Sequence, residues 1–462
     1  MILTAPPRLY IGAPRKSSGK TLLTVGLGAA FAHRGLWVQA FKKGLDYIDP
    51  LWHSAATGRS CRNLDPFSMG REGVTRNFLR HGAGAELALV EGNMGLFDGQ
   101  DLDGSDCGAA VAGWLETPIL LVVDCAGLSR GVAPLVLGHV GFPGGERIAG
   151  VILNNVASTR QEGRLKAALV HYGSPPVLGV IPRSETVAID ERHLGLAPVN
   201  EREDLAQRLT VIRDHVAAHV DLEGLLALAR RAPAWTATAA APDPSPPRLS
   251  PLPRVRVGYA KDRAFHFYYP ENLEALERAG AELVPFDLLE DPVLPEVDGL
   301  FIGGGFPEMF MESLAANRPL LEGIRRSAEA GMPIYAECGG LMLLSRFIRW
   351  GERVAPMAGV LPVDVAMHRR PQGFGYVTLE GTGALPWPPP GQVVRGHEFH
   401  HSQVERMESD IKFAYRLGRG VGLGERRDGL IYRNVLASYA HLHADGAPGW
   451  AEFLVDFWRR GA

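Results

Sequence analysis

Short apolar runs alternate with longer segments of helical spacing along most of this 462-residue chain. Nearly continuous apolar runs predict six strands in the first half, at residues 9–12, 37–41, 87–91, 119–124, 150–154 and 177–181. Four further strands are predicted at 255–260, 282–286, 299–302 and 333–336. Strands of this kind, separated by helices, are typical of parallel sheets whose two faces are both covered. The pattern therefore predicts an α/β protein with mostly parallel sheets and helices on both faces.

The alternation is interrupted at residues 231–253, where proline and small residues dominate. Such a segment cannot bury a core and is typical of a semi-extended linker. We therefore expect two α/β domains, at 1–230 and 254–462, because the chain is longer than one core usually serves. In sheets of this class ligands bind beyond the carboxyl ends of the strands, so the residues that follow each strand are the candidates for chemistry.

Charge and composition exclude several classes of protein. The formal net charge is −3, which leaves no basic field for nucleic acid. Apolar stretches end well before the roughly 18 residues that a membrane span needs, and the first residues lack the ordered regions of a secretory signal. The four cysteines are too sparse for a disulfide scaffold. We therefore expect a cytoplasmic protein that binds neither nucleic acid nor membrane.

Lysine is rare and clustered. Only seven of the 48 Lys and Arg residues are lysine, and four of those seven lie between positions 16 and 43. Two of them fall in APRKSSGKT, residues 13–21, between a predicted strand and a helical segment. Such a turn directs backbone N–H groups at phosphate, while the lysine and threonine of GKT reach the phosphates and Mg²⁺.

Pro14 replaces the first glycine of the usual P-loop spacing, so this is a variant P-loop. The alternative, a helix start with a solvated lysine, leaves the clustered lysines unexplained. We predict an ATP site on Lys16, Ser17, Ser18, Gly19, Lys20 and Thr21.

Charged residues also follow the second and third predicted strands. Lys42 or Lys43 next to Asp46 and Asp49 combines cations and carboxylates where an anionic substrate and Mg²⁺ would meet. Glu91 closes the third strand, and Asp98 follows in a glycine-rich loop. Strand ends of this kind are often only solvated turns, but a P-loop in the same sheet favours a site. They predict a metal site on Thr21, Asp46 and Glu91, and substrate contacts from Lys42, Asp46, Tyr47, Asp49 and Asp98.

One cysteine stands at a sharp turn between a strand and a helix. PIYAECGGL, residues 333–341, places Cys338 at such an elbow, where the thiol is exposed and the helix N-terminus favours its thiolate. The N–H of Gly339, and a second N–H from Gly304 in the upstream glycine turn, would bind an oxyanion formed there. The remaining cysteines lack this context and are interpreted as core residues: Cys61, Cys107 and Cys125.

The base for this thiol is expected from a histidine distant in sequence. SYAHLH, residues 438–443, places His441 and His443 on one face of a strand, because alternate residues point the same way. This resembles the class I glutamine amidotransferases, which combine a cysteine with His-x-Glu. His441 matches the histidine, and His443 stands in place of the orienting glutamate. A further cluster is interpreted as substrate-side or structural, since no spacing in it demands a metal: His397, Glu398, His400 and His401.

Long motifs in both halves extend this resemblance to one family. The chain is similar to the cobyrinic acid a,c-diamide synthase family in GKT, FKKGLDYIDPLWH, GRSCRNLDP, EGNMGLFDG and RHLGL, and then in AFHFYYPENLEAL, GLFIGGGFPEMF, PIYAECGGLM and ASYAHLH. The resemblance covers nearly the whole chain. It implies a dethiobiotin synthetase-like domain, which phosphorylates a carboxylate with ATP and Mg²⁺, fused to a glutamine amidotransferase domain.

The resemblance also carries individual residues. It implies that Asn154 recognises adenine. Related ATPases have a lysine five residues before the P-loop lysine, but this chain has Arg15 there, with Lys16 next to it. Arg15, Lys16, Lys42 and Lys43 are therefore alternative candidates for the additional phosphate contact.

The function that the resemblance implies is the ATP- and glutamine-dependent amidation of the a and c carboxylates of cobyrinic or hydrogenobyrinic acid. The partners would be small molecules, namely a corrinoid acid, L-glutamine and ATP, with a homodimer left open. One alternative is a related tetrapyrrole amidoligase, such as nickel sirohydrochlorin a,c-diamide synthase or cobyric acid synthase. Another is a P-loop ATPase switch with a non-catalytic second domain, against which the elbow cysteine and ASYAHLH argue.

Overall fold

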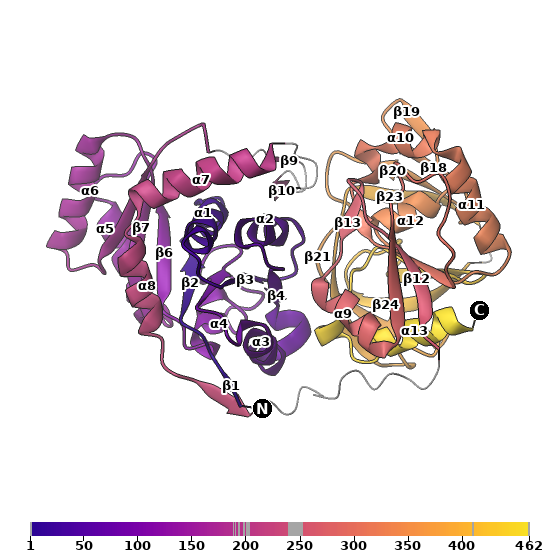
Figure 1. Cartoon of the computed structure of the whole chain (residues 1–462), viewed down its shortest axis with the longest axis horizontal. Coiled ribbons are helices and arrows are strands. Elements are labelled where there is room, and N and C mark those ends of the chain that lie inside the picture. The colour runs from indigo at the N-terminus through magenta and orange to yellow at the C-terminus, as the bar shows by residue number, and fades with distance from the viewer. Residues whose placement is uncertain are drawn as a thin grey trace. The chain divides into compact units, whose positions relative to one another are not determined.

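The chain folds into two units, Met1–Pro242 and Asp243–Ala462, in the computed structural model (Figure 1). The structure describes residues 2–187, 189, 191–192, 195–196, 199, 204–238, 253–408 and 411–460. Most of the predicted linker, 239–252, lies outside these residues, as do His193 and Leu194 of the RHLGL motif.

A seven-stranded sheet forms the centre of the first unit, in the order β4-β3-β5-β2-β6-β7-β8. All its neighbouring strands run parallel, which confirms the prediction for this half. The strands are β2 (Arg8–Gly12), β3 (Val38–Lys43), β4 (Arg62–Leu64), β5 (Leu87–Glu91), β6 (Ile119–Asp124), β7 (Ile148–Val156) and β8 (Val177–Pro182). Two short strands, β9 (Glu191–Arg192) and β10 (Gly195–Leu196), pair with each other.

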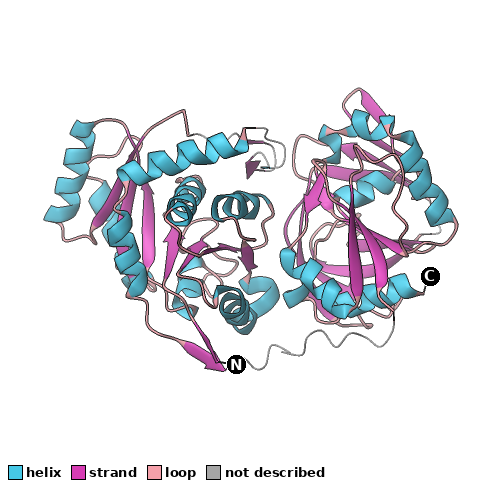
Figure 2. Cartoon of the chain, in the orientation of Figure 1, coloured by secondary structure: helices cyan, strands magenta, loops and turns pink. Residues whose placement is uncertain are grey.

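Helices cover both faces of this sheet (Figure 2). One face packs against α1 (Lys20–His33), α7 (Leu205–His219) and α8 (Leu222–Arg230), and α2 (Ile48–Thr57) packs beside α1. The other face packs against α3 (Pro66–Gly82), α4 (Gly108–Trp114), α5 (Val132–Val140) and α6 (Thr159–His171). The strands are apolar on both sides because both sides are covered.

Part of the predicted linker contacts the first unit. Strand β1 (Ile2–Thr4) pairs antiparallel with β11 (Thr236–Thr238). The buried Arg8 guanidinium donates to the Pro233 carbonyl at 2.9 Å, and the Trp235 ring lies 6.3 Å from that of Phe78. These contacts attach residues 233–238 to the first unit, although their sequence has no apolar period.

The second unit is built on a nine-stranded sheet, ordered β14-β12-β15-β17-β26-β25-β24-β21-β22. Its parallel strands are β12 (Val255–Ala260), β14 (Ala281–Phe286), β15 (Gly299–Ile302), β17 (Ile334–Glu337) and β26 (Val435–Ser438). The others run antiparallel: β21 (Gly373–Gly381), β22 (Val393–His400), β24 (Lys412–Arg419) and β25 (Arg427–Tyr432). The prediction of a mostly parallel sheet therefore holds from β14 to β26 and is wrong from β26 to β22, where neighbouring strands pair antiparallel.

Four more strands form a smaller sheet in this unit, ordered β19 (Arg353–Pro356), β18 (Phe347–Trp350), β20 (Val363–Met367) and β23 (Ser402–Met407). Helices α9 (Pro270–Ala279) and α13 (Trp450–Arg459) cover one face of the large sheet. The other face is covered by α10 (Met311–Ala316), α11 (Arg318–Glu329) and α12 (Gly339–Leu344). Strand β13 (Phe265–Phe267) pairs with β16 (Gly304–Gly305).

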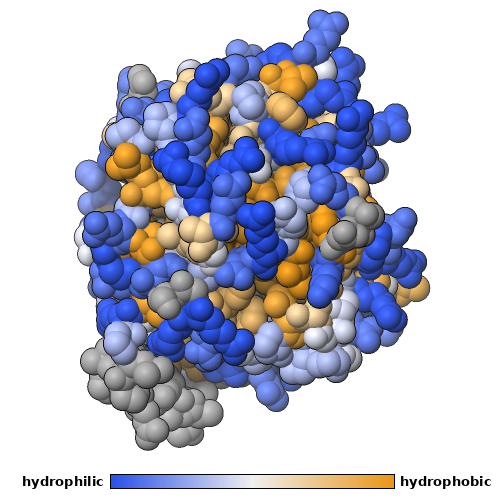
Figure 3. Space-filling model, turned by 90° about the vertical axis from the view of Figure 1, so that its right-hand side faces the viewer, coloured by the Kyte–Doolittle hydropathy of each residue, from blue (hydrophilic) through white to orange (hydrophobic). Residues whose placement is uncertain are grey.

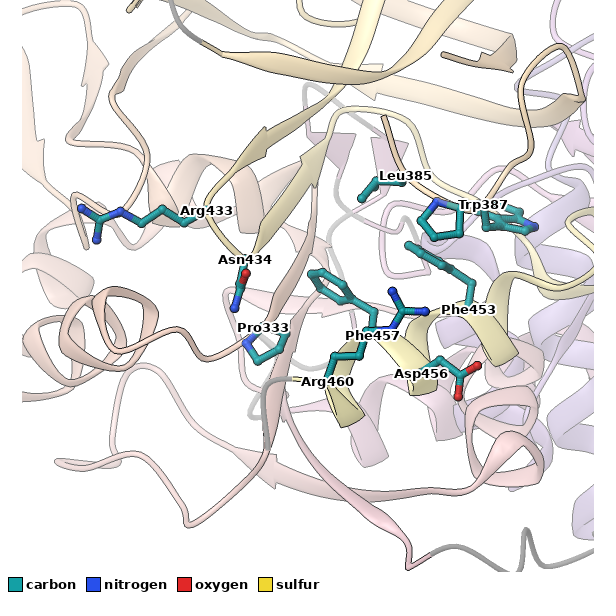
Figure 4. Close-up of a pocket in the computed structure, with 10 residues that line it drawn as sticks. Pro333, Leu385, Trp387, Arg433, Asn434, Phe453, Asp456, Phe457 and Arg460 are labelled. Atoms are coloured by element: carbon teal, nitrogen blue, oxygen red, sulfur yellow. The ribbon is translucent and has the colours of Figure 1, made fainter. Parts of the chain in front are cut away.

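Strands β17 and β26 end together, since Glu337 is the register partner of Ser438. Residues after Ser438 therefore leave the sheet beside Cys338. A surface pocket lies at the opposite end of these two strands, where Pro333 precedes β17 and Asn434 precedes β26. Figure 4 shows Phe453 and Phe457 of α13 lining this pocket. The pocket is therefore at the far end of β17 from the elbow cysteine.

Exposed apolar residues form small groups among charged ones on the face of the molecule drawn in Figure 3. Within the described residues, no helix combines the length and the apolar character needed to cross a membrane.

Candidate active sites

The phosphate loop connects β2 to α1, as predicted. Two of its residues have left-handed backbone conformations, Ser17 at φ 57° and Gly19 at φ 95°. A Cβ on Gly19 would lie 2.1 Å from Nδ2 of Asn154, so only glycine fits. The loop thus lies directly against the carboxyl end of β7.

The Lys20 ammonium folds back over this loop. It donates to the carbonyl oxygens of Met94 at 2.9 Å and of Arg15 at 3.4 Å. Burial, and next the Lys42 ammonium, lower the pKa of Lys20 to about 8. A phosphate in contact with Lys20 would therefore favour its charged form.

The other residues predicted around the phosphates lie in different places. The Asn154 amide donates to the Ser18 carbonyl at 2.9 Å and so supports the loop. Arg15 is largely exposed and forms an ion pair with Asp124 at 2.6 Å. Lys16 is exposed. Nothing in these contacts assigns adenine recognition to Asn154, which stays a prediction.

A buried cluster of charged and polar groups lies at the carboxyl ends of β3 and β5. The Lys42 ammonium lies 2.5 Å from Oδ2 of Asp49 and 2.7 Å from Oε1 of Glu91. The Thr21 hydroxyl donates to the same Glu91 oxygen at 2.8 Å. On the other Glu91 oxygen, Oε2, lies Nε2 of His53 at 2.5 Å. We call these five residues the carboxylate centre.

Opposite charges keep this centre ionised despite its burial. Burial alone would raise the pKa of Glu91, but Lys42 and then His53 hold it well below its usual range. Burial alone would lower the pKa of Lys42, but Asp49 and Glu91 raise it well above the ordinary value. His53 was not among the predicted site residues, although it lies in the FKKGLDYIDPLWH motif.

Asp49, rather than Asp46, lies beside Thr21 and shares the Lys42 ammonium with Glu91. The Asp49 carboxylate lies 3.3 Å from the Thr21 hydroxyl. Asp46 instead accepts backbone N–H groups of Ile48 at 2.8 Å and of Asp49 at 3.2 Å, at the start of α2. Burial and the neighbouring Asp49 raise the pKa of Asp46 to about 6.

The remaining predicted substrate residues surround this centre less closely. Lys43 follows Lys42 in β3, so its side chain lies on the opposite face of the strand. Its ammonium donates to Oδ1 of Asn93 at 3.2 Å. Asp98 accepts the Gly95 N–H at 2.8 Å within its own loop. Tyr47 is half-buried immediately before α2.

The elbow at Cys338 joins β17 to α12 as predicted, but the prediction of an exposed thiol is wrong, because Cys338 is buried. Cys338 has φ 48° and ψ −98°, a conformation that is strained for a residue with a side chain. Its N–H donates to the Ser438 carbonyl at 2.7 Å. A Cβ on Gly340 would lie 2.1 Å from the Ile302 carbonyl, and one on Gly339 would lie 3.1 Å from the Gly305 nitrogen. The two glycine turns therefore pack directly on each other.

The Cys338 thiol is not activated by its position alone. Burial, and next the Glu308 carboxylate, raise the pKa of Cys338, while the Gly339 N–H opposes this. Helix α12 has only six residues and its N-terminus does not overcome burial. Burial therefore opposes the thiolate that was expected from the helix N-terminus. The other three cysteines are buried, as predicted.

His441 lies beside the elbow. A Cβ on Gly304 would lie 2.7 Å from Cε1 of His441, which places the ring against the glycine turn that also touches Gly339. Its Nδ1 lies 2.9 Å from Oε2 of Glu337, the residue before Cys338. The predicted Cys338, Gly304, Gly339 and His441 therefore come together.

His443 does not take the place that its sequence position suggests. Strand β26 ends at Ser438, so the two histidines do not share a strand face. His443 Nδ1 accepts the Asp445 N–H at 3.2 Å, and its Nε2 lies 3.6 Å from Glu271. The carboxylate on His441 is Glu337.

The segment that carries His441 is held by a residue that the sequence did not reveal. Buried Asp428 accepts the Ser438 hydroxyl at 3.0 Å and the backbone N–H groups of Tyr439 at 3.1 Å and Ala440 at 2.9 Å. In the sequence, RRDGL resembles an ordinary turn.

The histidine cluster supports the same region. His397 and His441 exchange backbone hydrogen bonds of 3.1 and 2.8 Å. Glu398 accepts the N–H groups of Val421 and Gly422 at 2.7 and 2.8 Å, and the His400 ring stacks on Tyr439 at 3.8 Å. His401 Nδ1 lies 3.1 Å from the His368 carbonyl. Among the residues that the structure describes, no group of three or more His, Cys, Asp or Glu residues is arranged to hold a metal ion.

Both units match known families. Residues 13–196 match the CobQ/CobB/MinD/ParA nucleotide binding domain, and residues 256–449 match the CobB/CobQ-like glutamine amidotransferase domain. A cobyrinate a,c-diamide synthase from Magnetococcus marinus is 56% identical over 98% of this chain and 97% of its own length. Those from Methanosarcina acetivorans and Syntrophotalea carbinolica are 41% and 40% identical, over 97% and 98% of this chain and 95% and 99% of theirs. The chain therefore belongs to the cobyrinate a,c-diamide synthase family, whose members join a nucleotide-binding domain to a glutamine amidotransferase domain.

Proposed function

We propose that this chain amidates the a and c carboxylates of cobyrinic or hydrogenobyrinic acid, using ATP and ammonia taken from glutamine. The observation that carries the proposal is the pairing of two sites in one chain. The phosphate loop lies with the carboxylate centre in the first unit, and Cys338 lies with His441 in the second. The named relatives cover nearly all of the chain and have the same activity in their names.

The first site would activate the substrate carboxylate, which is itself a poor acyl acceptor. Loop N–H groups and the Lys20 ammonium would bind the phosphates of ATP. The γ-phosphoryl group would pass to a carboxylate oxygen, giving ADP and an acyl phosphate. Lys42, whose ammonium lies at the carboxylate centre, would meet the anionic groups that react.

Mg²⁺ fits the oxygen atoms of this centre. Thr21, Asp49 and Glu91 contribute a hydroxyl and two carboxylates, which are the ligand types that Mg²⁺ prefers beside phosphates. When bound, the ion would neutralise charge on the ATP phosphates. We propose Asp49 as a metal ligand in place of Asp46.

The second site would release ammonia from glutamine. His441 would accept the Cys338 thiol proton as sulfur attacks the amide carbon, with Gly304 and Gly339 supplying N–H groups to the oxyanion. The proton returned by His441 would leave with ammonia, giving a γ-glutamyl thioester, which water hydrolyses to glutamate. Ammonia would then displace phosphate from the acyl phosphate, and a second round would give the a,c-diamide.

Product analysis with candidate tetrapyrroles tests this function. Purified enzyme would be supplied with ATP, Mg²⁺, glutamine and either cobyrinic acid, hydrogenobyrinic acid or nickel sirohydrochlorin, and ADP and amidated product would be measured. We expect two amide groups on a corrinoid acid, with no product from Lys20→Ala. Product from nickel sirohydrochlorin alone would favour the sister amidoligase, and ATP hydrolysis independent of any tetrapyrrole would favour an ATPase switch.

We also propose a cytoplasmic location, where ATP and glutamine are supplied. A homodimer is the other untested part of the proposal, and light scattering during size-exclusion chromatography would measure it directly.

A further inference from the structure

Glu337 combines an unusual position with a direct contact to the proposed base. It is the last residue of β17, immediately before Cys338, and its side chain is 1% exposed. One carboxylate oxygen, Oε2, lies 2.9 Å from Nδ1 of His441, a residue 104 positions away in sequence. We propose that Glu337 is the positioning residue that orients His441 for glutamine hydrolysis, the role that the sequence pattern gives to position 443. The inference rests on the proposed glutaminase function of Cys338.

The second oxygen of Glu337 is fixed by a chain of hydrogen bonds. The Tyr335 hydroxyl donates to Oε1 at 2.7 Å, and the Trp450 indole N–H lies 3.3 Å from the Tyr335 oxygen. Because an indole nitrogen only donates, the Tyr335 oxygen accepts from Trp450 and directs its own proton to Glu337. Burial and then the Glu337 carboxylate raise the pKa of Tyr335, so the hydroxyl keeps that proton.

This series of hydrogen bonds determines which nitrogen of His441 carries hydrogen. An ionised carboxylate has no proton to donate, so Nδ1 must be the donor toward Glu337. The lone pair of a neutral imidazole then lies on Nε2. The ring lies against the glycine turn through Cε1, the carbon between its two nitrogens, and Nδ1 faces Glu337. Glu337 therefore leaves Nε2 as the atom of His441 that can accept a proton.

The structure gives His443 different neighbours. Its Nδ1 accepts a backbone N–H from Asp445, and its ring lies 4.8 Å from that of Tyr269. A neutral imidazole would also lack the negative charge that stabilises an imidazolium during proton transfer. The loss of glutamate at position 443 is thus compensated from β17.

Glu337→Gln tests the inference because the hydrogen bonds predict how the amide is oriented. The Tyr335 hydroxyl donates to the position of Oε1, so the amide oxygen of the variant would lie at that position and its NH₂ group would face His441 Nδ1. The histidine must then carry its proton on Nε2, where it cannot accept the thiol proton. We expect the kcat of glutamine hydrolysis to fall by about 100-fold or more, the contribution typical of a general base. KM for glutamine should change little, because Glu337 would not contact the substrate.

A second variant distinguishes this role from a structural one. In Tyr335→Phe/Glu337→Gln the hydroxyl is gone, so the amide can rotate and present its oxygen to Nδ1. We expect this double variant to recover about tenfold of the lost kcat, part of the general-base contribution. A structural defect would instead grow worse when a second buried group is removed.

Three further measurements complete the experiment. Glu312→Gln is the control, since it makes the same change at an exposed carboxylate of this unit that pairs with Arg353, and its kcat should remain near that of the wild type. Amidation with ammonium chloride should continue in every variant, which shows that the chain is folded. Cys338→Ala should abolish glutamine hydrolysis; if it does not, the proposed glutaminase function itself fails.

If Cys338→Ala is inactive but Glu337→Gln hydrolyses glutamine at the wild-type rate, only the role of Glu337 is overturned. A double variant no faster than Glu337→Gln would equally overturn the orientation mechanism.

Discussion

Replacing Lys42 by methionine tests how the carboxylate centre balances its charges. Methionine keeps much of the side-chain length but removes the ammonium that lies 2.5 Å from Asp49 and 2.7 Å from Glu91. Both carboxylates would remain, and Glu91 is fully buried. We therefore expect the first unit to lose stability, and added Mg²⁺ to restore part of it by taking the place of the lost cation.

The magnitude follows from the burial of the pair. Removing one partner of a buried ion pair costs about 3–5 kcal/mol. The lower value applies here, because Thr21 and His53 still contact Glu91. For a unit of this size, about 3 kcal/mol corresponds to a fall in Tm of about 6–12 °C. Mg²⁺ at about 100 times its Kd would return about 2.7 kcal/mol.

Scanning calorimetry of the full-length chain measures this effect, with EDTA in one sample and Mg²⁺ in the other. The transition of the first unit is identified as the one that ATP raises. Lys43→Met is the matched control, because Lys43 is a neighbouring buried lysine whose ammonium meets an Asn93 oxygen instead. Burial lowers the pKa of Lys43, so its loss should cost less, and Mg²⁺ should stabilise this variant no more than it stabilises the wild type. Equal destabilisation by the two variants, or no recovery of Lys42→Met with Mg²⁺, would refute this reasoning.

Other parts of both sites lead to further expected outcomes. Because burial and Lys42 lower the pKa of Lys20 to about 8, the free enzyme loses this proton as pH rises through that value. ATP binding should then take up a proton above pH 8 and almost none at about pH 6.5, and calorimetry in buffers of different ionisation enthalpy should show uptake that Lys20→Arg abolishes. Asp49→Asn should weaken Mg²⁺-dependent ATP turnover more than Asp46→Asn, and equal KM values for Mg²⁺ would contradict the assignment of Asp49. Asp428→Asn should cost about 1–3 kcal/mol of stability and slow glutamine hydrolysis, because a carboxylate that accepts four hydrogen bonds loses acceptor capacity. Unchanged hydrolysis would show that Asp428 does not position His441.

Most of the parallel strands were predicted, because a strand that is buried on both faces has a nearly continuous apolar run in its sequence. The parallel strands β4 and β26 were not predicted. Strand β21 was not predicted, since its buried positions alternate with partly exposed ones and its sequence, GFGYVTLEG, contains several glycines. The antiparallel half of the second sheet is built from strands of this kind, so it was not predicted either. Its existence depends on pairing between neighbours that a single run does not reveal.

The candidate sites were predictable where chemistry needs residues that are close in sequence. GKT and the elbow around Cys338 are local patterns, and both have the expected geometry. Glu337 was missed because in the sequence it is only the polar residue that ends an apolar strand. Its role depends on the pairing of β26 with β17, which brings His441 to it. Asp46 was predicted as a metal ligand, although the local sequence does not distinguish it from Asp49 in this respect. The difference arises in the fold. Because α2 begins at Ile48, Asp46 accepts backbone N–H groups at the helix start, and Asp49 lies at the carboxylate centre.

The use of two nitrogen sources by Cys338→Ala tests the two-site account most directly. Amidated corrinoid and ADP would be measured with glutamine and, separately, with ammonium chloride at a pH that supplies free ammonia. Because Cys338 belongs to the second unit and the phosphate loop to the first, we expect product with ammonia and none with glutamine. Equal loss of product with both nitrogen sources, in a variant that still binds ATP, would contradict the account.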